Sequence, residues 1–371
     1  MFPSRRIVTS GGDSFRDEYS LEFDGTDDSV LTAGDDTAAD ATYVWWMKSN
    51  ITGKNRGVFG HGSQNRGAFH LNYNNSNPLW FRGGSNYRYW DDTSAQDDGQ
   101  WHQWVVVNDH SDITACKLYI DGIEQSVSTD PATVSSGSVT AYSTNLCIGA
   151  DVDGTNHFVG NISEFAWYDI MLTDGQIKTI YNSRESYNNK EGVASANLKG
   201  WWRMGDGSLD DRNSAFEHIG DETNPTLGAE LITNGGFDTD SNWTVSSGTS
   251  NNWAIAGGTI NHTDDGSDDT VQSRQSGVGV VGKIYKVSFD ITAFTSGSVH
   301  VDLGDTGTGV GATRSAVGSY SEYLMATGTF VDIEPADGTV LSVDNVSVRL
   351  VGGNSGICIN MAAEDFTGDT P

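Results

Sequence analysis

Short runs of alternating apolar and polar residues occur along most of the chain, separated by clusters of Gly, Asn, Asp and Ser. Between residues 20 and 183 these runs include TYVWWMK, AFHLNY, WHQWVVVND, CKLYIDG and HFVGNISEF. A period of two is typical of β-strands with one buried face, and the polar clusters supply turns. We therefore predict an all-β domain, an antiparallel β-sandwich of the jelly-roll type, over residues 20–183.

A second series of strand-like runs extends over residues 230–351. KIYKVSFDI and LSVDNVSVRL alternate cleanly, which predicts strands with one core-facing and one solvent-facing side. The segment between the two series, 184–229, is interpreted as an irregular connector. Residues 1–19 are interpreted as a polar N-terminal arm, and residues 352–371 as a Gly-rich and then acidic C-terminal tail. The chain is thus expected to hold two antiparallel β-sandwich domains.

One segment of the chain has the pattern of a helix instead. Thr173 and Gln176 have the spacing of a capping box, in which each side chain binds the backbone N–H of the other residue. Ile177, Ile180 and Tyr181 follow at the spacing of a buried helical stripe. We predict one short helix here, which closes the first domain.

Glycine and proline usage agrees with a protein built of strands and tight turns. The chain has 45 Gly and 6 Pro, and glycine readily adopts the positive φ that hairpin turns require. Asp121-Gly122, directly after CKLYI, predicts a hairpin with a type I′ turn.

The charge balance narrows the choice of partners. Lys and Arg number 21 and Asp and Glu number 50, so the formal net charge is −29. An acidic surface of this kind repels phosphate backbones and anionic lipids, and we therefore expect neither nucleic acid nor membrane as a partner. Such a surface suits a saline medium, where salt screens the repulsion, and it attracts divalent cations.

Cysteines and the first residues of the chain bear on the cellular compartment. Cys116, Cys147 and Cys358 are odd in number and lack the spacing of metal ligands, so we expect buried, reduced thiols. The start of the chain, MFPSRRIVTSGGDS, has no apolar run of the length of an export signal. We expect synthesis in the cytosol without an export signal.

Six sequence blocks of the first domain carry a family resemblance. They are SLEFDGTDDSV, WWMK, DGQWHQWVVVND, LYIDG, LCIGAD and FVGNISEFAWYDIMLTDGQI. In this order and spacing they resemble the laminin-G-like, concanavalin-A-like lectin/glucanase family. The resemblance implies a two-sheet jelly roll that binds sugars or proteins, in some members through a calcium ion at the sandwich edge.

Two blocks of the second domain resemble a different group of proteins. ELITNGGFDTDSNWT at 230–244 and LSVDNVSV at 341–348 are similar to the ends of carbohydrate-binding modules of the galactose-binding-like jelly-roll type. Those modules hold a structural calcium ion near the joined chain ends. The resemblance implies Asp238 and Asp344 as calcium ligands, provided that the first and last strands of this domain lie side by side.

The order of all these blocks resembles that of virion structural proteins of tailed bacteriophages, particularly marine ones. This implies a virion protein assembled in the host cytoplasm: a head decoration, a fibre or a tail-associated adhesin. Its partners would be other virion proteins, further copies of itself in a homo-oligomer, and host surface glycans. Arg5, Arg6 and Arg16 concentrate positive charge in the N-terminal arm, and we expect this arm to dock onto an acidic partner surface.

Two carboxylates among aromatic residues, Glu164 and Asp169 in FVGNISEFAWYDIML, could indicate a glycosidase. Such an enzyme needs its two carboxyl groups on one side of the scissile bond. Residues five apart on a regular strand point to opposite faces, although a β-bulge could bring them together. We interpret this strand as structural, and His102 as a packed strand residue. The expected protein is not an enzyme.

Aromatic side chains that are exposed can stack on the apolar face of a sugar ring. The segment PLWFRGGSNYRYWDD places Trp80, Tyr87, Tyr89 and Trp90 around a Gly-Gly turn. Trp243 and Trp253 are the candidates in the second domain. The alternative is that these rings belong to the core or to subunit contacts.

The sequence therefore predicts a non-enzymatic virion structural protein with lectin-like domains. An extracellular polysaccharide-binding protein is the first alternative, and a polysaccharide hydrolase or lyase is the second.

Overall fold

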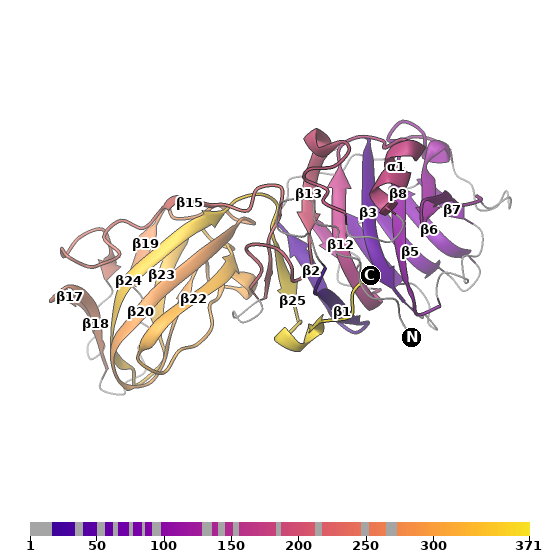
Figure 1. Cartoon of the computed structure of the whole chain (residues 1–371). Coiled ribbons are helices and arrows are strands. Elements are labelled where there is room, and N and C mark those ends of the chain that lie inside the picture. The colour runs from indigo at the N-terminus through magenta and orange to yellow at the C-terminus, as the bar shows by residue number, and fades with distance from the viewer. Residues whose placement is uncertain are drawn as a thin grey trace, which may run out of the picture. The chain divides into compact units, whose positions relative to one another are not determined.

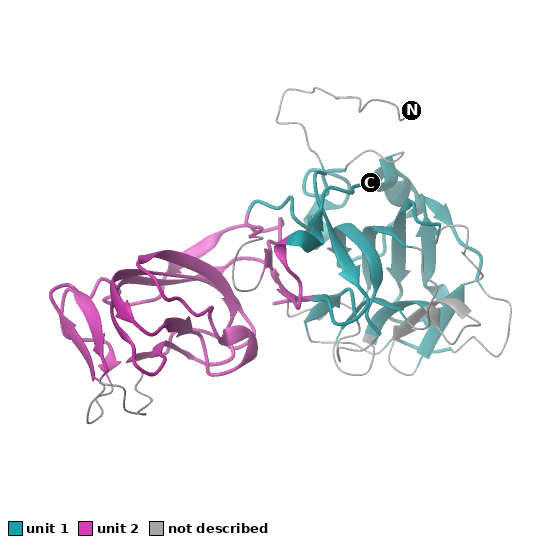
Figure 2. Ribbon diagram, turned by 90° about the horizontal axis from the view of Figure 1, so that it is seen from below, with its two compact units in different colours: residues 1–29, 36–208, 364–371 teal, residues 30–35, 209–363 magenta. Residues whose placement is uncertain are grey.

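The computed structural model describes most of the chain, in segments separated by short gaps. The described residues are 17–33, 40–49, 56–61, 66–73, 77–83, 86–90, 98–127, 136–139, 145–150, 156–182, 187–211, 217–245, 252–264 and 273–371. The chain divides into two compact units, which Figure 2 colours separately. Unit 1 comprises Met1–Ser29, Asp36–Ser208 and Glu364–Pro371, and unit 2 comprises Val30–Asp35 and Leu209–Ala363.

Unit 1 contains a large antiparallel sheet, of which β1, β3, β8, β12 and β13 are labelled in Figure 1. Its strand order is β10-β9-β8-β3-β12-β1-β26, with β13 pairing with β12. The strands are β10 (Ile123–Glu124), β9 (Lys117–Ile120), β8 (Trp101–Asn108), β3 (Ala41–Lys48), β12 (Val159–Tyr168), β1 (Ser20–Asp24), β26 (Phe366–Thr367) and β13 (Leu198–Trp202).

The central strand of this sheet, β3, is covered on both faces. Tyr43 and Trp45 lie at one parity and their rings contact Phe59, at centroid distances of 4.6 and 5.3 Å. Val44 lies at the other parity and packs in a cluster with Ile177 of the helix. Because both faces are buried, the strand is a nearly continuous apolar run, TYVWWM, instead of a strict alternation.

The second sheet of unit 1 faces this core. Within the unit its order is β11-β4-β5-β6-β7, all antiparallel where the register is defined. The strands are β11 (Leu146–Ile148), β4 (Arg56–His61), β5 (Arg66–Tyr73), β6 (Asn77–Gly83) and β7 (Asn86–Trp90). Phe59 and Phe69 from this sheet stack with ring centroids 6.1 Å apart, and both contact Trp45. Two sheets with an aromatic core between them form the predicted sandwich.

The predicted helix is present as α1 (Asp174–Tyr181). Thr173 and Gln176 form the capping box through both reciprocal hydrogen bonds, of 3.3 and 2.9 Å. Ile177 and Ile180 are buried, as predicted, whereas Tyr181 is only half-buried. The hairpin at Asp121-Gly122 is also confirmed, with φ of 50° and 72° at the two turn residues.

Unit 2 is a second antiparallel sandwich. Its larger sheet has the order β17-β18-β24-β20-β22 with β15 pairing with β24, and its smaller sheet has the order β16-β19-β23-β21. The strands of the larger sheet are β17 (Asn252–Ala256), β18 (Thr259–Thr263), β24 (Val340–Val351), β20 (Ile284–Ser296), β22 (Gly318–Met325) and β15 (Leu227–Glu230). Those of the smaller sheet are β16 (Thr244–Val245), β19 (Ser273–Ser276), β23 (Phe330–Pro335) and β21 (Val299–Asp302).

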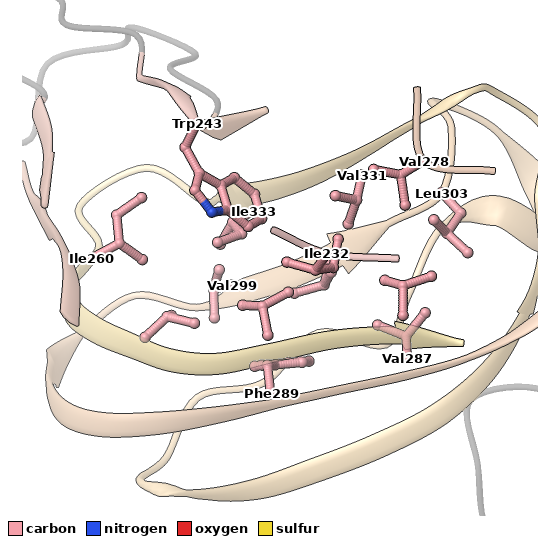
Figure 3. Packing of buried hydrophobic residues seen from close by; sticks show 14 of the residues in the cluster. Ile232, Trp243, Ile260, Val278, Val287, Phe289, Val299, Leu303, Val331 and Ile333 are labelled. Atoms are coloured by element: carbon pink, nitrogen blue, oxygen red, sulfur yellow. The ribbon is translucent and has the colours of Figure 1, made fainter. Parts of the chain in front are cut away.

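The core of unit 2 is mainly aliphatic. Figure 3 shows Val287 and Phe289 of β20 across from Val331 and Ile333 of β23, and all four are at most 1% exposed. Their alternation with polar neighbours in KVSFD and FVDIE produces one apolar face on each sheet. The predicted all-β fold with two sandwiches and one short helix is therefore confirmed.

Strands also occur in the segments that the sequence analysis treats as a connector and a tail. Strands β13 and β14 (His218–Ile219) lie within 184–229, and β15 begins there at Leu227 and ends at Glu230. Strands β25 (Gly356–Ile359) and β26 lie within 352–371. Strand β25 lies between β14 and β2 (Ser29–Thr32). Strand β26 pairs with β1 through Ser20–Thr367 and Leu21–Phe366. These strands are two to five residues long, too short for a periodic pattern to reveal.

None of the helices in the described part of the chain has the length and apolar character needed to cross a membrane.

Candidate functional site

Strands β6 and β7 bring three of the predicted sugar-binding residues together. In their antiparallel register Trp80 lies opposite Tyr89, and Arg82 lies opposite Tyr87. Residues directly opposite each other share a face of the sheet, and so do residues two apart on one strand. Positions 80, 87 and 89 therefore lie on one face, which we call the β6–β7 face.

The two tyrosines of this face touch each other. Their rings meet edge to face with centroids 5.2 Å apart and an interplanar angle of 61°. Tyr87 is half-buried, whereas Tyr89 is 8% exposed. Tyr89 thus supports the ring of Tyr87, which is the more accessible of the two.

The neighbouring strand β5 continues the face. His70 lies opposite Trp80, and Ala68 lies opposite Arg82. Both β5 residues are buried, with exposed fractions of at most 1%. The β6–β7 face therefore combines three aromatic positions with one guanidinium position, and the enclosed His70 lies at its border. His70 was not predicted to lie on this face, although its alternation with Phe69 and Leu71 in AFHL indicates that it points away from the core.

Trp90 was predicted to bind sugar and is placed differently by the structure. It is adjacent to Tyr89 on β7, so it points to the opposite, core side of the sheet, and it is 1% exposed. A ring enclosed in the core has no face left for a sugar, so the prediction for Trp90 is wrong. Asp91 and Asp92, which follow it, lie outside the described residues.

The two tryptophan candidates of unit 2 are also corrected. Trp243 is 7% exposed, packs on Phe237 at 5.3 Å and donates its Nε1–H to the carbonyl of Asn234. Figure 3 shows its indole directed toward Ile333 in the core. Trp253 is 4% exposed and packs on the ring of His262 at 4.7 Å. Both indoles pack in the interior of unit 2. This agrees with the alternative interpretation of the sequence, in which these rings belong to the core.

Glu164 stands in a buried network and not in an open cleft. A β-bulge between Ser163 and Ala166 gives Glu164 a φ of +51° and interrupts the alternation of β12. Its Oε2 accepts a hydrogen bond of 2.6 Å from Trp201 Nε1, and its Oε1 accepts one of 2.8 Å from Arg203 Nε. Burial raises the pKa of the Glu164 carboxyl well above its usual range, and the nearby charge of Asp17 raises it further.

Asp169 has a separate set of partners. Its Oδ1 accepts from Asn197 Nδ2 at 2.9 Å, and its Oδ2 lies 3.0 Å from Lys199 Nζ on an exposed surface. The regular alternation of side chains between the two faces, which we expected for β12, is interrupted at the bulge between Ser163 and Ala166. Glu164 and Asp169 are nevertheless held in different environments, one enclosed and one half-exposed, so they do not form a glycosidase pair.

His102 is held by two carboxylates. Its Nδ1 lies 2.7 Å from Asp121 Oδ2 and its Nε2 lies 3.3 Å from Asp98 Oδ1. The side chain is 10% exposed. With both nitrogens engaged, His102 acts as the packed strand residue that the sequence predicted.

The condition for the predicted calcium site is met, because β15 and β24, near the two ends of the second β-sandwich, pair in the sheet. The loop after β15 also contacts β24: Val346 donates its backbone N–H to Gly235 at 3.0 Å. Asp238 is exposed in this loop, and Asp344 is half-buried on β24 with its Oδ1 accepting from Asn345 N at 2.7 Å. Calcium itself stays a prediction.

Two other groups of acids and histidines converge within the described residues. Each brings its ligand atoms within 4.8 Å of one another, and neither includes Asp238 or Asp344. They are Asp24 with Asp27 and Asp28 in unit 1, and His300 with Asp302 and Glu334 in unit 2. Arg5, Arg6 and Arg16 of the predicted docking arm lie outside the described residues.

Known structures resemble this chain at low sequence identity. A Bacteroides ovatus protein whose description suggests carbohydrate binding is 13% identical with a TM-score of 0.41, and the match covers 57% of each chain. A heptameric SAP-like pentraxin from Limulus polyphemus is 15% identical with a TM-score of 0.34, over 44% of this chain and 82% of the other. Domain 4 of an extracellular arabinanase from Geobacillus stearothermophilus, solved with arabinotriose, is 19% identical with a TM-score of 0.33, over 47% and 84%. No curated protein sequence matches the chain.

A family model gives the assignment of the first part of the chain. The model for the concanavalin A-like lectin/glucanases superfamily matches residues 23–178, which is less than half of the chain. These residues fall in the part of the chain from β1 to α1 that forms the two sheets of the first sandwich and its closing helix. Residues 23–178 therefore have the concanavalin A-like lectin/glucanase fold.

Proposed function

We propose that this protein is a non-enzymatic glycan-binding protein and that the β6–β7 face is its binding site. The observation that carries the proposal is the register that sets Trp80 opposite Tyr89 and Tyr87 opposite Arg82, on the face of the sheet away from the buried Trp90. A lectin fold over the same residues supports it.

Rings and charged groups on one face suit a sugar for a physical reason. The C–H face of a pyranose stacks on an aromatic ring, while a guanidinium group hydrogen-bonds to its hydroxyls. Strands hold these positions at fixed spacing, so the backbone of the site does not have to be ordered when the sugar binds. Tyr87 is half-buried and braced by Tyr89, which favours it as the stacking platform.

The buried state of Glu164 favours binding over hydrolysis. A general acid must reach the glycosidic oxygen, and both oxygens of Glu164 are already bound by Trp201 and Arg203. A hydrolase or lyase is the second alternative. Release of reducing sugar from a polysaccharide would support this alternative, and absence of release would argue against it.

We further propose that the protein belongs to the virion of a tailed bacteriophage, as a head decoration, fibre or tail-associated adhesin in homo-oligomeric form. The order of its sequence blocks supports this, and the net charge of −29 suits a particle surface in a saline medium. An extracellular polysaccharide-binding protein would use the β6–β7 face equally well.

Unit 2 would act as a galactose-binding-like module with calcium at Asp238 and Asp344.

A glycan array with the full chain tests the binding function. We expect binding to a defined group of polysaccharides without release of reducing sugar, and loss of that binding in Trp80→Ala. A wild-type chain that binds no glycan, or a Trp80→Ala chain that binds as well as the wild type, would argue against the β6–β7 face. The copy number of the protein in purified bacteriophage particles tests the virion role separately. Its presence at a fixed copy number would support that role, and its absence would favour the extracellular alternative.

A further inference from the structure

The outer face of the smaller sheet of unit 2 carries a compact set of possible metal ligands. His300 and Asp302 are two residues apart on β21, so they share a face, and His300 lies opposite Glu334 on β23. The ligand atoms of the three side chains all lie within 4.8 Å of one another, and His300 Nε2 is 3.2 Å from Asp302 Oδ2. The separation of 3.2 Å between His300 and Asp302 suits two ligands of one ion with bonds of about 2.0–2.2 Å, and Glu334 is close enough to become the third after a small side-chain movement.

Asp302 is held rigidly in this set. It is 2% exposed, and its Oδ1 accepts a hydrogen bond of 2.9 Å from the backbone N–H of Gly311. Its Oδ2 is the oxygen that faces His300. His300 and Glu334 are half-buried, so an ion could reach the three side chains from solvent.

The surroundings of the set are rich in negative charge. Asp332 lies opposite Asp302 and is bound by Arg274, which also reaches Asp305 at 3.4 Å. A cation placed among these carboxylates would relieve their mutual repulsion.

A second observation is a buried carboxylate oxygen that lacks a hydrogen-bond partner near this set. Glu322 has a fully buried side chain, and within the described residues its Oε1 accepts no hydrogen bond. A Cβ added to Gly311 would lie 2.6 Å from this oxygen, so Oε1 faces the residue whose N–H holds Asp302. Arg314 and the backbone N–H of Ala312 bind only the other oxygen, Oε2. A buried carboxylate oxygen that lacks a hydrogen-bond donor is costly, and a cation bound at Asp302 would add to the compensation that Arg314 already gives Glu322.

We infer that His300, Asp302 and Glu334 bind one divalent transition-metal ion of the Zn²⁺ type. One imidazole nitrogen and two carboxylate oxygens are ligands that Zn²⁺ accepts, whereas Ca²⁺ prefers oxygen ligands throughout. Three protein ligands leave a position for water or for an oxygen of an outside ligand. The ion would also fasten the edge strand β21 to β23. This site is separate from the β6–β7 face and from Asp238 and Asp344.

Titration of the metal-stripped full chain with ZnCl₂ by calorimetry tests the inference, with Co²⁺ absorption spectra as a second readout of the ligands. We expect Zn²⁺ to bind at this site in the wild-type chain and to bind at least about tenfold more weakly in His300→Gln and in Glu334→Gln. His110→Gln and Glu191→Gln in unit 1, which belong to neither group of converging acids and histidines within the described residues, serve as controls and should bind as the wild type does. Circular dichroism would show that each variant is folded.

Equal Zn²⁺ affinity in His300→Gln and wild type, absence of Zn²⁺ binding in the wild type, or preference for Ca²⁺ at this site would each overturn the inference. Calcium binding that survives in His300→Gln but is lost in Asp238→Asn would report the other predicted site.

Discussion

The indole Nε1 of Trp201 donates a hydrogen bond of 2.6 Å to Oε2 of Glu164 across the paired strands β13 and β12. Arg203 occupies the other oxygen of Glu164 and reaches Asp17 Oδ1 at 3.4 Å. Arg203 therefore joins three parts of the chain that are far apart in sequence. The carboxylate most suggestive of catalysis is thus a structural group of unit 1.

Removing the Arg203 guanidinium from this network should destabilise unit 1. We expect Arg203→Met to lower the free energy of unfolding of unit 1 by about 3–5 kcal/mol, because Glu164 and Asp17 would lose the charge that compensates them in the interior. Urea unfolding followed by tryptophan fluorescence measures the change.

Lys199→Met is the matched control for that experiment. Lys199 pairs with Asp169 on the surface, with side chains 43% and 32% exposed, and such pairs contribute about 0–1 kcal/mol. Equal destabilisation by the two substitutions would show that the Arg203 network has no special role.

Most of the fold could be predicted from the sequence because its signals are local. The capping box at Thr173 and Gln176 and the Asp121-Gly122 turn involve neighbouring residues, and both are present as predicted. Burial of Cys116, Cys147 and Cys358 was likewise predicted and is confirmed.

The site was less predictable because it depends on register and on distant partners. Tyr89 and Trp90 are both aromatic, and only the pairing of β6 with β7 shows which of them shares a face with Trp80. Glu164 lies 39 residues from Arg203 in sequence, so no local pattern could reveal their contact. The group of His300, Asp302 and Glu334 was not predicted for the same reason, because its members lie on two strands that are distant in sequence. In HVD and DIE, however, polar and apolar residues alternate, which places the polar residues of each strand on one face.

Gly235 should not tolerate a side chain. A Cβ at this position would lie 2.0 Å from the carbonyl oxygen of Val346, whereas a Cβ at Gly236 would meet nothing within 4 Å. We expect Gly235→Ala to lower the melting temperature of unit 2 by several degrees, because the loop must move away from β24. Calorimetry measures this shift. Gly236→Ala should change it little, and identical melting of the two variants would contradict the contact.

Unit 2 should lose stability in mild acid through His218. This ring is fully buried, stacks on Tyr323 at 4.0 Å and contacts the Leu209 carbonyl through Nδ1 at 2.8 Å. Burial lowers the pKa of His218 to about 4. Its unfolded pKa is near 6.5, so the unfolded chain binds the proton first as the pH falls. The contribution of His218 is complete above pH 6.5 and is lost progressively down to about pH 4.

Comparison with His218→Phe isolates this contribution, because phenylalanine can keep the stack on Tyr323 without titrating. Between pH 7 and pH 4.5 we expect the wild type to lose roughly 2–3 kcal/mol more of its free energy of unfolding than the variant. Parallel losses in the two chains, measured by urea unfolding, would show that His218 is not the group responsible.

The thiols should be unreactive in the native protein. Cys116 is 1% exposed, and burial raises the pKa of its thiol to about 12. Since the thiolate is the reactive form, we expect no reaction with the thiol reagent DTNB until the chain is unfolded, when all 3 cysteines react. A rapid reaction of Cys116 under native conditions would contradict its placement in the core.

Binding of a glycan by the β6–β7 face is tested most directly by one titration. Calorimetry with the best polysaccharide from the array would compare the wild type with Tyr87→Ala and with Tyr320→Ala, a half-buried tyrosine of unit 2. We predict that Tyr87→Ala weakens binding by about tenfold or more, since a stacking ring is lost, and that Tyr320→Ala binds as the wild type does. Unchanged affinity in Tyr87→Ala would contradict the assignment of the site.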